Sequence, residues 1–241
     1  ILLLVPQIAF ALFFNGGFEN GNFGSWHIES GINPSLTTNP PFTGLPVSEN
    51  VNWNLFDWTP SESLITSGAG FDPIARILPV VQYGDHSARV NNQINGAHAT
   101  RIWQEDQLRE SDRDPVDNNF YLRFAWAAVL ENPGHSSSQQ PYFHISIVNV
   151  TDNNTVIYNN FNYSNQPGLA WRTDNVSSGW LWVPWQEENI TLQDNQVTLA
   201  SVGDTLRIEL SAADCSPTGH GGYAYLDGFR SQPGTQQTDT A

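Results

Sequence analysis

Four short segments alternate apolar and polar residues with a period of two, and this alternation constrains the fold more than any other feature of the chain. Successive side chains of a β-strand point to opposite faces, so the pattern predicts strands with one buried and one solvated side. Turn-rich spacers separate the segments, which predicts an all-β antiparallel sandwich. The alternating apolar residues are Phe120, Leu122, Phe124 and Trp126; Phe143, Ile145 and Ile147; Val156 and Tyr158; and Leu206, Ile208 and Leu210.

The length and charge of the chain narrow its class and its partners. A chain of 241 residues, 39% of them hydrophobic, suits one sandwich domain with a sizeable core. The formal net charge is −15, and all nine basic residues are arginine, which argues against nucleic acid and anionic membranes as partners. Cys215 is the only cysteine, so stability must come from the core, a bound metal or assembly rather than from an intrachain disulfide.

Residues 1–14 are apolar apart from Pro6 and Gln7, and they are too few for a membrane-spanning helix, which needs about 20 residues. Two interpretations remain open, and both place the protein outside the cell. The segment is the remainder of a secretory signal with a small-x-small cleavage site at residues 9–11. Alternatively, it is a strand donated to a neighbouring subunit. In that arrangement residues of one parity would fill the partner's groove, namely Leu2, Leu4, Ile8, Phe10 and Leu12.

The chain is expected to divide into an apolar arm at residues 1–14, a sandwich at residues 15–230 and a flexible tail at residues 231–241. Residues 28–75 are predicted to form long loops with one or two short strands. The charged stretch 104–119 is predicted to be a solvated loop. Asp112, Asp114 and Asp117 within it could bind a second calcium ion, but the stretch lacks the glycine and distal glutamate of an EF-hand, which favours the solvated loop.

Two glycine-rich runs, residues 12–26 and residues 219–229, each predict a strand beside a turn with a carboxylate at the junction. These carboxylates are Glu19 and Asp227. The first and last strands of a sandwich often pair, so the two runs could meet around one hard cation. Calcium accepts irregular sets of about six to eight carboxylate and carbonyl oxygens, which suits such a junction.

Residues 15–26 (Asn-Gly-Gly-Phe-Glu-Asn-Gly-Asn-Phe-Gly-Ser-Trp) resemble the opening of jelly-roll modules of the galactose-binding-like type, which include several carbohydrate-binding module families. Residues 84–92, 128–135 with 140–143, and 214–227 are similar to a subset found in large secreted bacterial surface proteins with adhesive roles. The resemblance extends from residue 12 to residue 229. It implies an antiparallel jelly-roll β-sandwich.

The resemblance also implies a structural calcium ion between the first and last strands. Its ligands would be the carboxylates of Glu19 and Asp227 and the carbonyl oxygen of Gly17. The alternative is that Glu19 caps a turn and Asp227 lies in a hairpin, without a metal.

Other residues are candidates for chemistry. Cys215 and His220 could bind zinc or form a nucleophile–base pair, but the sequence offers no further soft ligand at a usual spacing. The favoured interpretation is that Cys215 is a buried core residue and that His220, together with His135, braces the loops. Glu105 and Glu187 are unpaired candidates for glycoside hydrolysis, and no pattern singles them out. We therefore expect no enzymatic activity.

Tryptophan side chains could form a platform for sugar rings, although tryptophan is more often a core residue. The candidates are Trp58, Trp103, Trp180 and Trp182.

The sequence thus predicts a secreted, calcium-stabilised structural or adhesive subunit that self-assembles into extracellular filaments by donating its N-terminal strand. The alternative is a carbohydrate-binding module of a secreted protein. The expected partners are copies of the chain or a glycan, with no membrane insertion.

Overall fold

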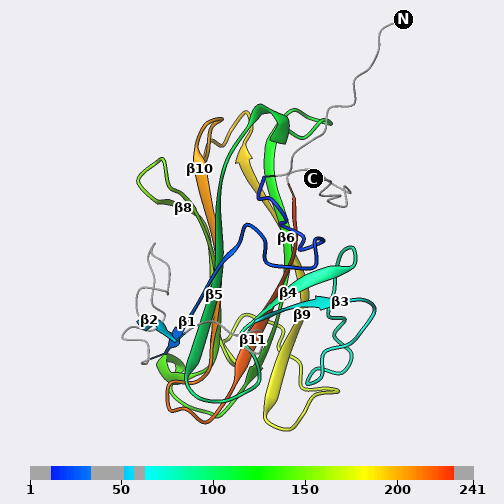
Figure 1. Cartoon of the computed structure of the whole chain (residues 1–241), viewed down its shortest axis with the longest axis vertical. Helices are drawn as coiled ribbons and strands as arrows, with labels where there is room; N and C mark the ends of the chain where they lie inside the picture. The colour runs from blue at the N-terminus through cyan, green and yellow to red at the C-terminus, as the bar shows by residue number, and fades with distance from the viewer. Residues whose placement is uncertain (1–11, 34–51, 57–62, 231–241) are drawn as a thin grey trace, which may run out of the picture.

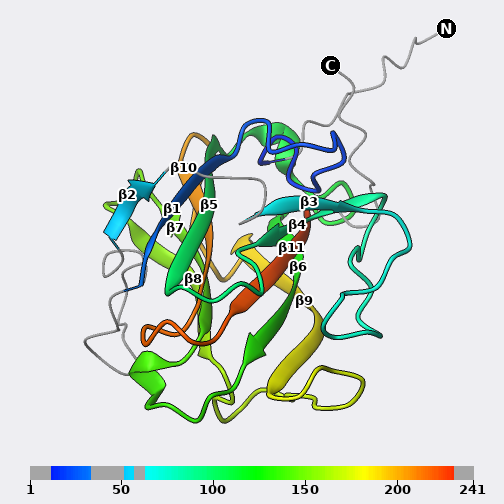
Figure 2. The same ribbon diagram turned by 60° about the horizontal axis from the view of Figure 1, so that its bottom comes forward.

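The computed structural model describes residues 12–33, 52–56 and 63–230 and consists of two antiparallel sheets that face each other (Figure 1). The six-stranded sheet has the order β2-β1-β5-β10-β7-β8, and the five-stranded sheet has the order β3-β4-β11-β6-β9. The strands are β1 (His27–Ile32), β2 (Asn52–Phe56), β3 (Leu64–Ser67), β4 (His86–Val90), β5 (His98–Gln107), β6 (Phe120–Glu131), β7 (Tyr142–Asn149), β8 (Thr155–Tyr163), β9 (Trp180–Gln193), β10 (Thr205–Ala213) and β11 (Gly222–Arg230). The turned view in Figure 2 shows the two sheets as separate layers.

The strand order confirms the predicted jelly roll. Strands β4 to β11 form two four-stranded sheets, β4-β11-β6-β9 and β5-β10-β7-β8, in which the first and last strands of the set pair with each other. This arrangement of eight strands in two facing sheets is the jelly-roll topology. Strands β1 and β2 extend one sheet and β3 extends the other.

The core lies between the sheets and is formed by the apolar residues of the alternating segments, as their period of two predicts. Phe124 stacks on Phe229 with ring centroids 4.5 Å apart, which joins β6 to the end of β11. Val156 and Tyr158 of β8 are only half-buried, because β8 is the edge strand. The predicted members that are fully or almost fully buried here are Phe120, Leu122, Phe124, Trp126, Phe143, Ile145, Ile147, Leu206, Ile208 and Leu210.

Residues 12–25 form successive turns rather than the predicted strand, and β1 begins only at His27. The turns are nevertheless fixed against the last strand, because Phe229 donates its backbone N–H to the carbonyl of Gly16 at 3.3 Å. The ring of Phe13 meets Phe229 edge-on at 5.6 Å. The expected meeting of the two ends of the domain is therefore present, through packing onto β11 rather than through strand pairing.

The outer face of the five-stranded sheet is covered. The β3–β4 connection runs outside this sheet in Figure 2, and its Ala75, Leu78 and Val80 pack on Tyr223 and Tyr225 of β11. Asp72 of the same connection accepts hydrogen bonds from both tyrosine hydroxyls, at 2.7–2.9 Å. A second apolar cluster therefore closes this side of the sandwich.

Two loop predictions need correction. Residues 28–75 contain most of β1 and all of β2 and β3, one strand more than expected. In the stretch 104–119, β5 continues to Gln107, and Asp112 and Asp114 are buried rather than solvated. Asp112 accepts the backbone N–H of Arg109 at 2.7 Å within the loop, and Asp114 pairs with Arg123 of β6 at 3.0 Å, which links the loop to the sheet. Within the described residues, no helix is both long and apolar enough to cross a membrane.

Candidate functional site

The outer face of the six-stranded sheet carries a dense set of polar and aromatic side chains, which we call the polar sheet face. Core residues alternate with these positions along each strand, so the remaining side chains point away from the core. The strand register aligns them in rows across β5, β10, β7 and β8. The rows are Trp103, Glu209, Ser146 and Asn159; Arg101, Ser211, His144 and Phe161; and Ala99, Ala213, Tyr142 and Tyr163, with Arg207 beside the first row.

A charge network occupies the centre of this face. Oε2 of the buried Glu209 accepts hydrogen bonds from Arg207 at 3.1 Å and from Arg101 at 3.4 Å. Arg101 also pairs with Glu29 of β1. Pairing is needed here because an isolated buried carboxylate is costly. The network therefore holds both guanidinium groups in place on the sheet.

Trp103 is the predicted glycan-binding residue that lies on this face. Its ring stacks on His27 with centroids 3.9 Å apart and planes inclined by 12°. The guanidinium of Arg207 lies 4.1 Å from the ring centroid. Trp103 is thus held by neighbouring strands and is only partly exposed, with its indole N–H buried.

Several buried polar atoms on the polar sheet face have no hydrogen-bond partner among the described residues. A buried polar atom left unpaired costs about 1–3 kcal/mol, so a group of such atoms on one face calls for an explanation. Together they offer two N–H donors, one carboxylate acceptor and two hydroxyl groups. They are Trp103 Nε1, Arg207 Nε, Glu209 Oε1, Ser211 Oγ and Tyr142 OH.

Burial also shifts the titration of this face. It lowers the pKa of His144 to about 4, although a hydrogen bond to Asn159 opposes the shift. His144 is therefore neutral at physiological pH. Burial likewise raises the pKa of the Tyr142 hydroxyl, and the charge of Glu209 adds to this effect, so Tyr142 keeps its proton as a donor.

The other tryptophan candidates lie elsewhere. Trp180 and Trp182 share a strand face, as predicted, but they are 8% and 2% exposed within the apolar cluster on the five-stranded sheet. Indole Nε1 of Trp182 donates to the carbonyl of Asp174 at 3.1 Å. The structure therefore corrects the prediction that these two rings stack on sugars. Trp58 lies outside the described residues.

The predicted calcium residues meet at one loop. Glu19 accepts backbone N–H groups of Asp85 and His86 through its carboxylate, at 3.1–3.3 Å. Oδ2 of Asp227 accepts those of Gln82 and Tyr83, both at 2.8 Å. The two carboxylates, which are distant in sequence, thus bind neighbouring peptides of residues 82–86.

Asp227 has features of a metal ligand. Its side chain is fully buried, and Oδ1 has no hydrogen-bond partner among the described residues. Burial raises the pKa of Asp227 to about 8, and the negative charge of Glu19 adds to the increase, while the N–H groups of Tyr83 and Gln82 oppose it. Gly17 is also buried. Carboxylate oxygens are ligands that calcium accepts.

The predicted arm divides at residue 12. Leu12 is fully buried in the protein's own core, so the structure gives it a role within the fold rather than in a partner's groove. Leu2, Leu4, Ile8 and Phe10 lie outside the described residues.

His135, Cys215 and His220 come together at one end of the sandwich, and the rings of the two histidines lie 5.2 Å apart.

On the polar sheet face, the sequence alone did not assign a role to Tyr142, Arg207, Glu209 or Ser211. Arg207 and Glu209 stand at the polar positions of the alternating β10 sequence. Polar positions alone do not distinguish a binding face from an ordinary solvated face.

The chain matches no known protein-family profile and no curated protein. Among solved structures it is similar to an apo cyclase from Fischerella sp., with 13% identity, a TM-score of 0.43, and coverage of 92% of this chain and 94% of that one. It is also similar to the C-terminal family 22 carbohydrate-binding module of Clostridium thermocellum Xyn10B, with 13% identity, a TM-score of 0.34, and coverage of 96% and 99%.

A third similar structure belongs to a study of carbohydrate-binding modules from the β-sandwich superfamily. It shares 9% identity with a TM-score of 0.36, and the match covers 92% of this chain but only 62% of the other. At these identities and TM-scores, function has to be argued from the chain's own residues.

Proposed function

We propose that the protein is a non-enzymatic carbohydrate-binding module and that the polar sheet face binds a neutral carbohydrate chain. The observation that carries this proposal is the set of polar and aromatic side chains that remain partly or fully exposed on one sheet face, namely Arg101, Trp103, Asn159, Phe161, Tyr163 and Arg207. A sugar chain presents many hydroxyl groups, each of which both donates and accepts hydrogen bonds. Its hydroxyls can therefore hydrogen-bond the exposed Asn159 and the partly exposed Arg101, Arg207 and Tyr163.

The charges of the site support a neutral ligand. The polar sheet face contains Arg101 and Arg207 together with Glu209 and Glu29, so neither sign prevails locally. The net charge of −15 for the whole chain disfavours an anionic polysaccharide. The opposite outer face is closed by its own apolar cluster.

The test measures the affinity of the protein for soluble neutral polysaccharides, namely a β-glucan, a mannan and a xylan, by isothermal titration calorimetry. Two variants each remove one polar group that the face exposes, Tyr163→Phe and Asn159→Ala. Both side chains lie at the surface, and Asn159→Ala gives up one hydrogen bond to His144, so the fold should tolerate both changes. Loss of one hydrogen bond to the ligand is expected to weaken binding by about 5- to 10-fold in each case.

Tyr121→Phe is the matched control, because Tyr121 lies on the outer face of the other sheet and bonds Asp117 there. It should bind the polysaccharide as the unaltered protein does. Equal affinities for all three variants, or no binding to any of the three polysaccharides, would contradict the proposal.

Calcium is part of the proposed function as a structural ion at Glu19, Asp227 and Gly17. The support for it is the unpaired Oδ1 of Asp227 beside a second carboxylate. Secretion, and assembly of copies through the apolar residues before Leu12, stay predictions of the sequence.

A further inference from the structure

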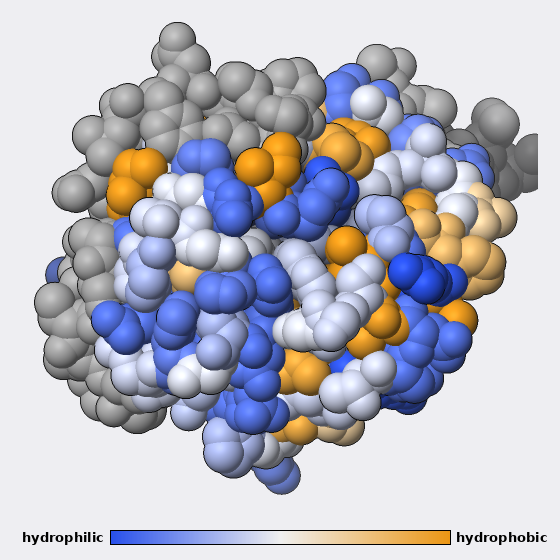
Figure 3. Space-filling view, turned by 90° about the horizontal axis from the view of Figure 1, so that it is seen from below, coloured by the Kyte–Doolittle hydropathy of each residue, from blue (hydrophilic) through white to orange (hydrophobic). Residues whose placement is uncertain are grey.

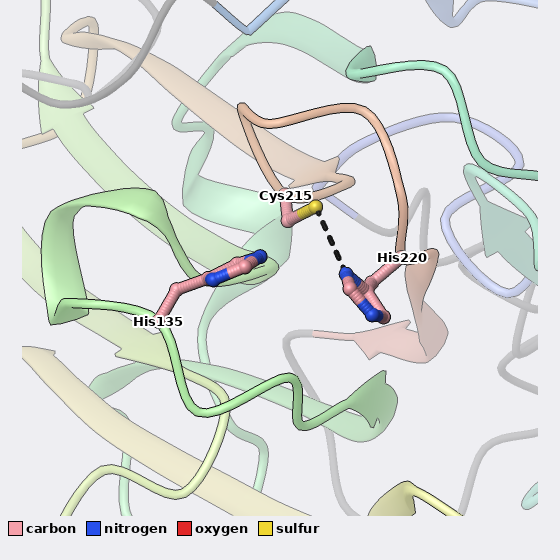
Figure 4. Close-up of side chains that lie close together, drawn as sticks. All are labelled: His135, Cys215 and His220. Carbon is pink, nitrogen blue, oxygen red and sulfur yellow. Dashed lines mark hydrogen bonds between the residues drawn. The ribbon is translucent and has the colours of Figure 1, made fainter.

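Two loops of the jelly roll meet at one end of the sandwich and bring three nitrogen and sulfur ligands together. His135 belongs to the β6–β7 connection, and Cys215 and His220 belong to the β10–β11 connection. One ligand atom from each residue lies within 4.8 Å of the other two. Figure 4 shows the His135 ring pointing toward Cys215 and His220 from the opposite loop.

The loops are held together by their own backbone. Ser216 donates its N–H to the carbonyl of Gln139 at 3.3 Å, which links one loop to the other. A second hydrogen bond runs from the N–H of Glu131 to the carbonyl of Gly221, at 3.1 Å. Within the second loop, the N–H of Cys215 donates to the carbonyl of His220 at 2.9 Å. The three ligands are thus positioned by main-chain bonds that do not involve their side chains.

The distance between the first two ligands fits a tetrahedral metal. Sγ of Cys215 and Nδ1 of His220 lie 3.4 Å apart in a hydrogen bond, which a bound metal would replace (Figure 4). A zinc ion about 2.3 Å from sulfur and about 2.0 Å from nitrogen places these atoms about 3.5 Å apart. The pair therefore already has the spacing of one edge of a zinc coordination tetrahedron.

His135 supplies an independent observation. Its Nε2 atom is buried and has no hydrogen-bond partner among the described residues. The His135 ring packs on His220, as the predicted bracing of the loop requires, but this packing leaves Nε2 without a partner. A metal ligand needs an unpaired nitrogen that faces the other ligands.

We propose that His135, Cys215 and His220 form a zinc site that binds the β6–β7 connection to the β10–β11 connection. Thiolate and imidazole ligands select zinc over the hard, oxygen-preferring calcium ion, so this site is chemically distinct from Glu19 and Asp227. Three protein ligands leave the fourth zinc position to a water molecule. Polar residues make up much of this end of the molecule in Figure 3.

The experiment titrates zinc into metal-free full-length protein in competition with a chromophoric chelator. It then repeats the titration with Cys215→Ser, His135→Ala and the control His27→Ala, whose histidine is exposed on β1. The unaltered protein and the control should bind one zinc ion with equal affinity. Each ligand variant should bind zinc at least about 10-fold more weakly. Substitution of residues that only support the ligands already lowers metal affinity by about 10-fold or more.

Cobalt provides a second readout, because a cysteine thiolate bound to cobalt gives a sulfur-to-metal charge-transfer band in the near ultraviolet. The band should appear in the unaltered protein and vanish in Cys215→Ser. Should that variant not fold by circular dichroism, His135→Ala decides, since Nε2 of His135 makes no hydrogen bond that the fold would lose. Absence of one-to-one zinc binding, or unchanged affinity in His135→Ala, would overturn the proposal.

Discussion

Glu19 and Asp227 bind neighbouring peptides of one loop, so the start and the end of the domain are joined through residues 82–86. Their two negative charges are close enough to raise the pKa of Asp227, and in the absence of a cation this proximity destabilises the ionised form. A bound cation would reverse the effect. The relationship therefore links the proposed calcium site directly to stability.

Removal of calcium should lower the melting temperature. At a free calcium concentration of one hundred times Kd, binding stabilises the fold by about 2.7 kcal/mol, which corresponds to about 5–10 °C in a domain of this size. Differential scanning calorimetry after chelation, followed by re-addition of calcium or zinc, measures the shift. Calcium should restore the lost stability and zinc should not.

Asp227→Asn tests the same site. The amide oxygen can still accept the N–H groups of Gln82 and Tyr83, so the loop is retained while a charged ligand is lost. The variant should melt at the same temperature with and without calcium. If chelation leaves the melting temperature of the unaltered protein unchanged, Glu19 and Asp227 bind the loop without a metal.

Acidification should destabilise the protein through His144. Its pKa falls from 6.5 to about 4 on folding, because burial disfavours the charged ring. The unfolded chain therefore takes up a proton at a higher pH than the folded one. The stability that neutral His144 contributes is full above pH 6.5 and is lost as the pH falls toward 4.

The variant His144→Gln isolates this contribution. Between about pH 7 and about pH 4.5, the unaltered protein should lose about 2–3 kcal/mol more unfolding free energy than the variant. Asp112, Asp214 and Asp227 have raised pKa values and act in the opposite direction over this range, but they are common to both proteins. Urea unfolding at the two pH values measures the difference. Parallel losses would contradict the role of His144.

Gly16→Ala should destabilise the junction between the first turns and β11. An added Cβ would lie 2.7 Å from Cβ of Phe229 and 2.9 Å from the carbonyl oxygen of Phe13, and neither atom can move freely. Overpacking of this kind costs about 1–3 kcal/mol. Gly70→Ala is the control, since its nearest neighbour would be the side chain of Val80 at an ordinary 3.7 Å. Thermal denaturation should separate the two variants.

Leu12→Ala should show that residue 12 belongs to the fold. Leu12 is fully buried in the core, and truncation of such a residue costs about 2–5 kcal/mol. Phe14→Ala, at a side chain that is 44% exposed, should cost less than about 1 kcal/mol. Equal unfolding free energies for the two variants would mean that Leu12 contributes nothing to the core.

The alternation in four segments was sufficient to predict the sandwich and its inward-facing residues. Leu206, Ile208 and Leu210 could be assigned to the core because strand geometry makes burial a local consequence of spacing. The same logic gave Trp180 and Trp182 one shared face. It did not show that the β3–β4 connection would cover that face, because a loop's path depends on contacts remote in sequence.

The candidate sites depended more strongly on tertiary structure. Glu19 and Asp227 could be paired in advance, since a resemblance placed them at the first and last strands. Tyr142 and Ser211 became a shared face only through the register of β7 and β10, which a single sequence does not reveal. His135 reached Cys215 and His220 because the jelly roll brings two separate connections to one end of the sandwich.

The sequence by itself thus determined the alternating strands, their inward-facing residues and the class of fold, because these follow from the period of side chains along a strand. Only the tertiary structure decided which polar groups are buried together and which lose their partners. The physical reason is that pairing between side chains requires register and loop packing, and both are set by contacts between segments far apart in the chain.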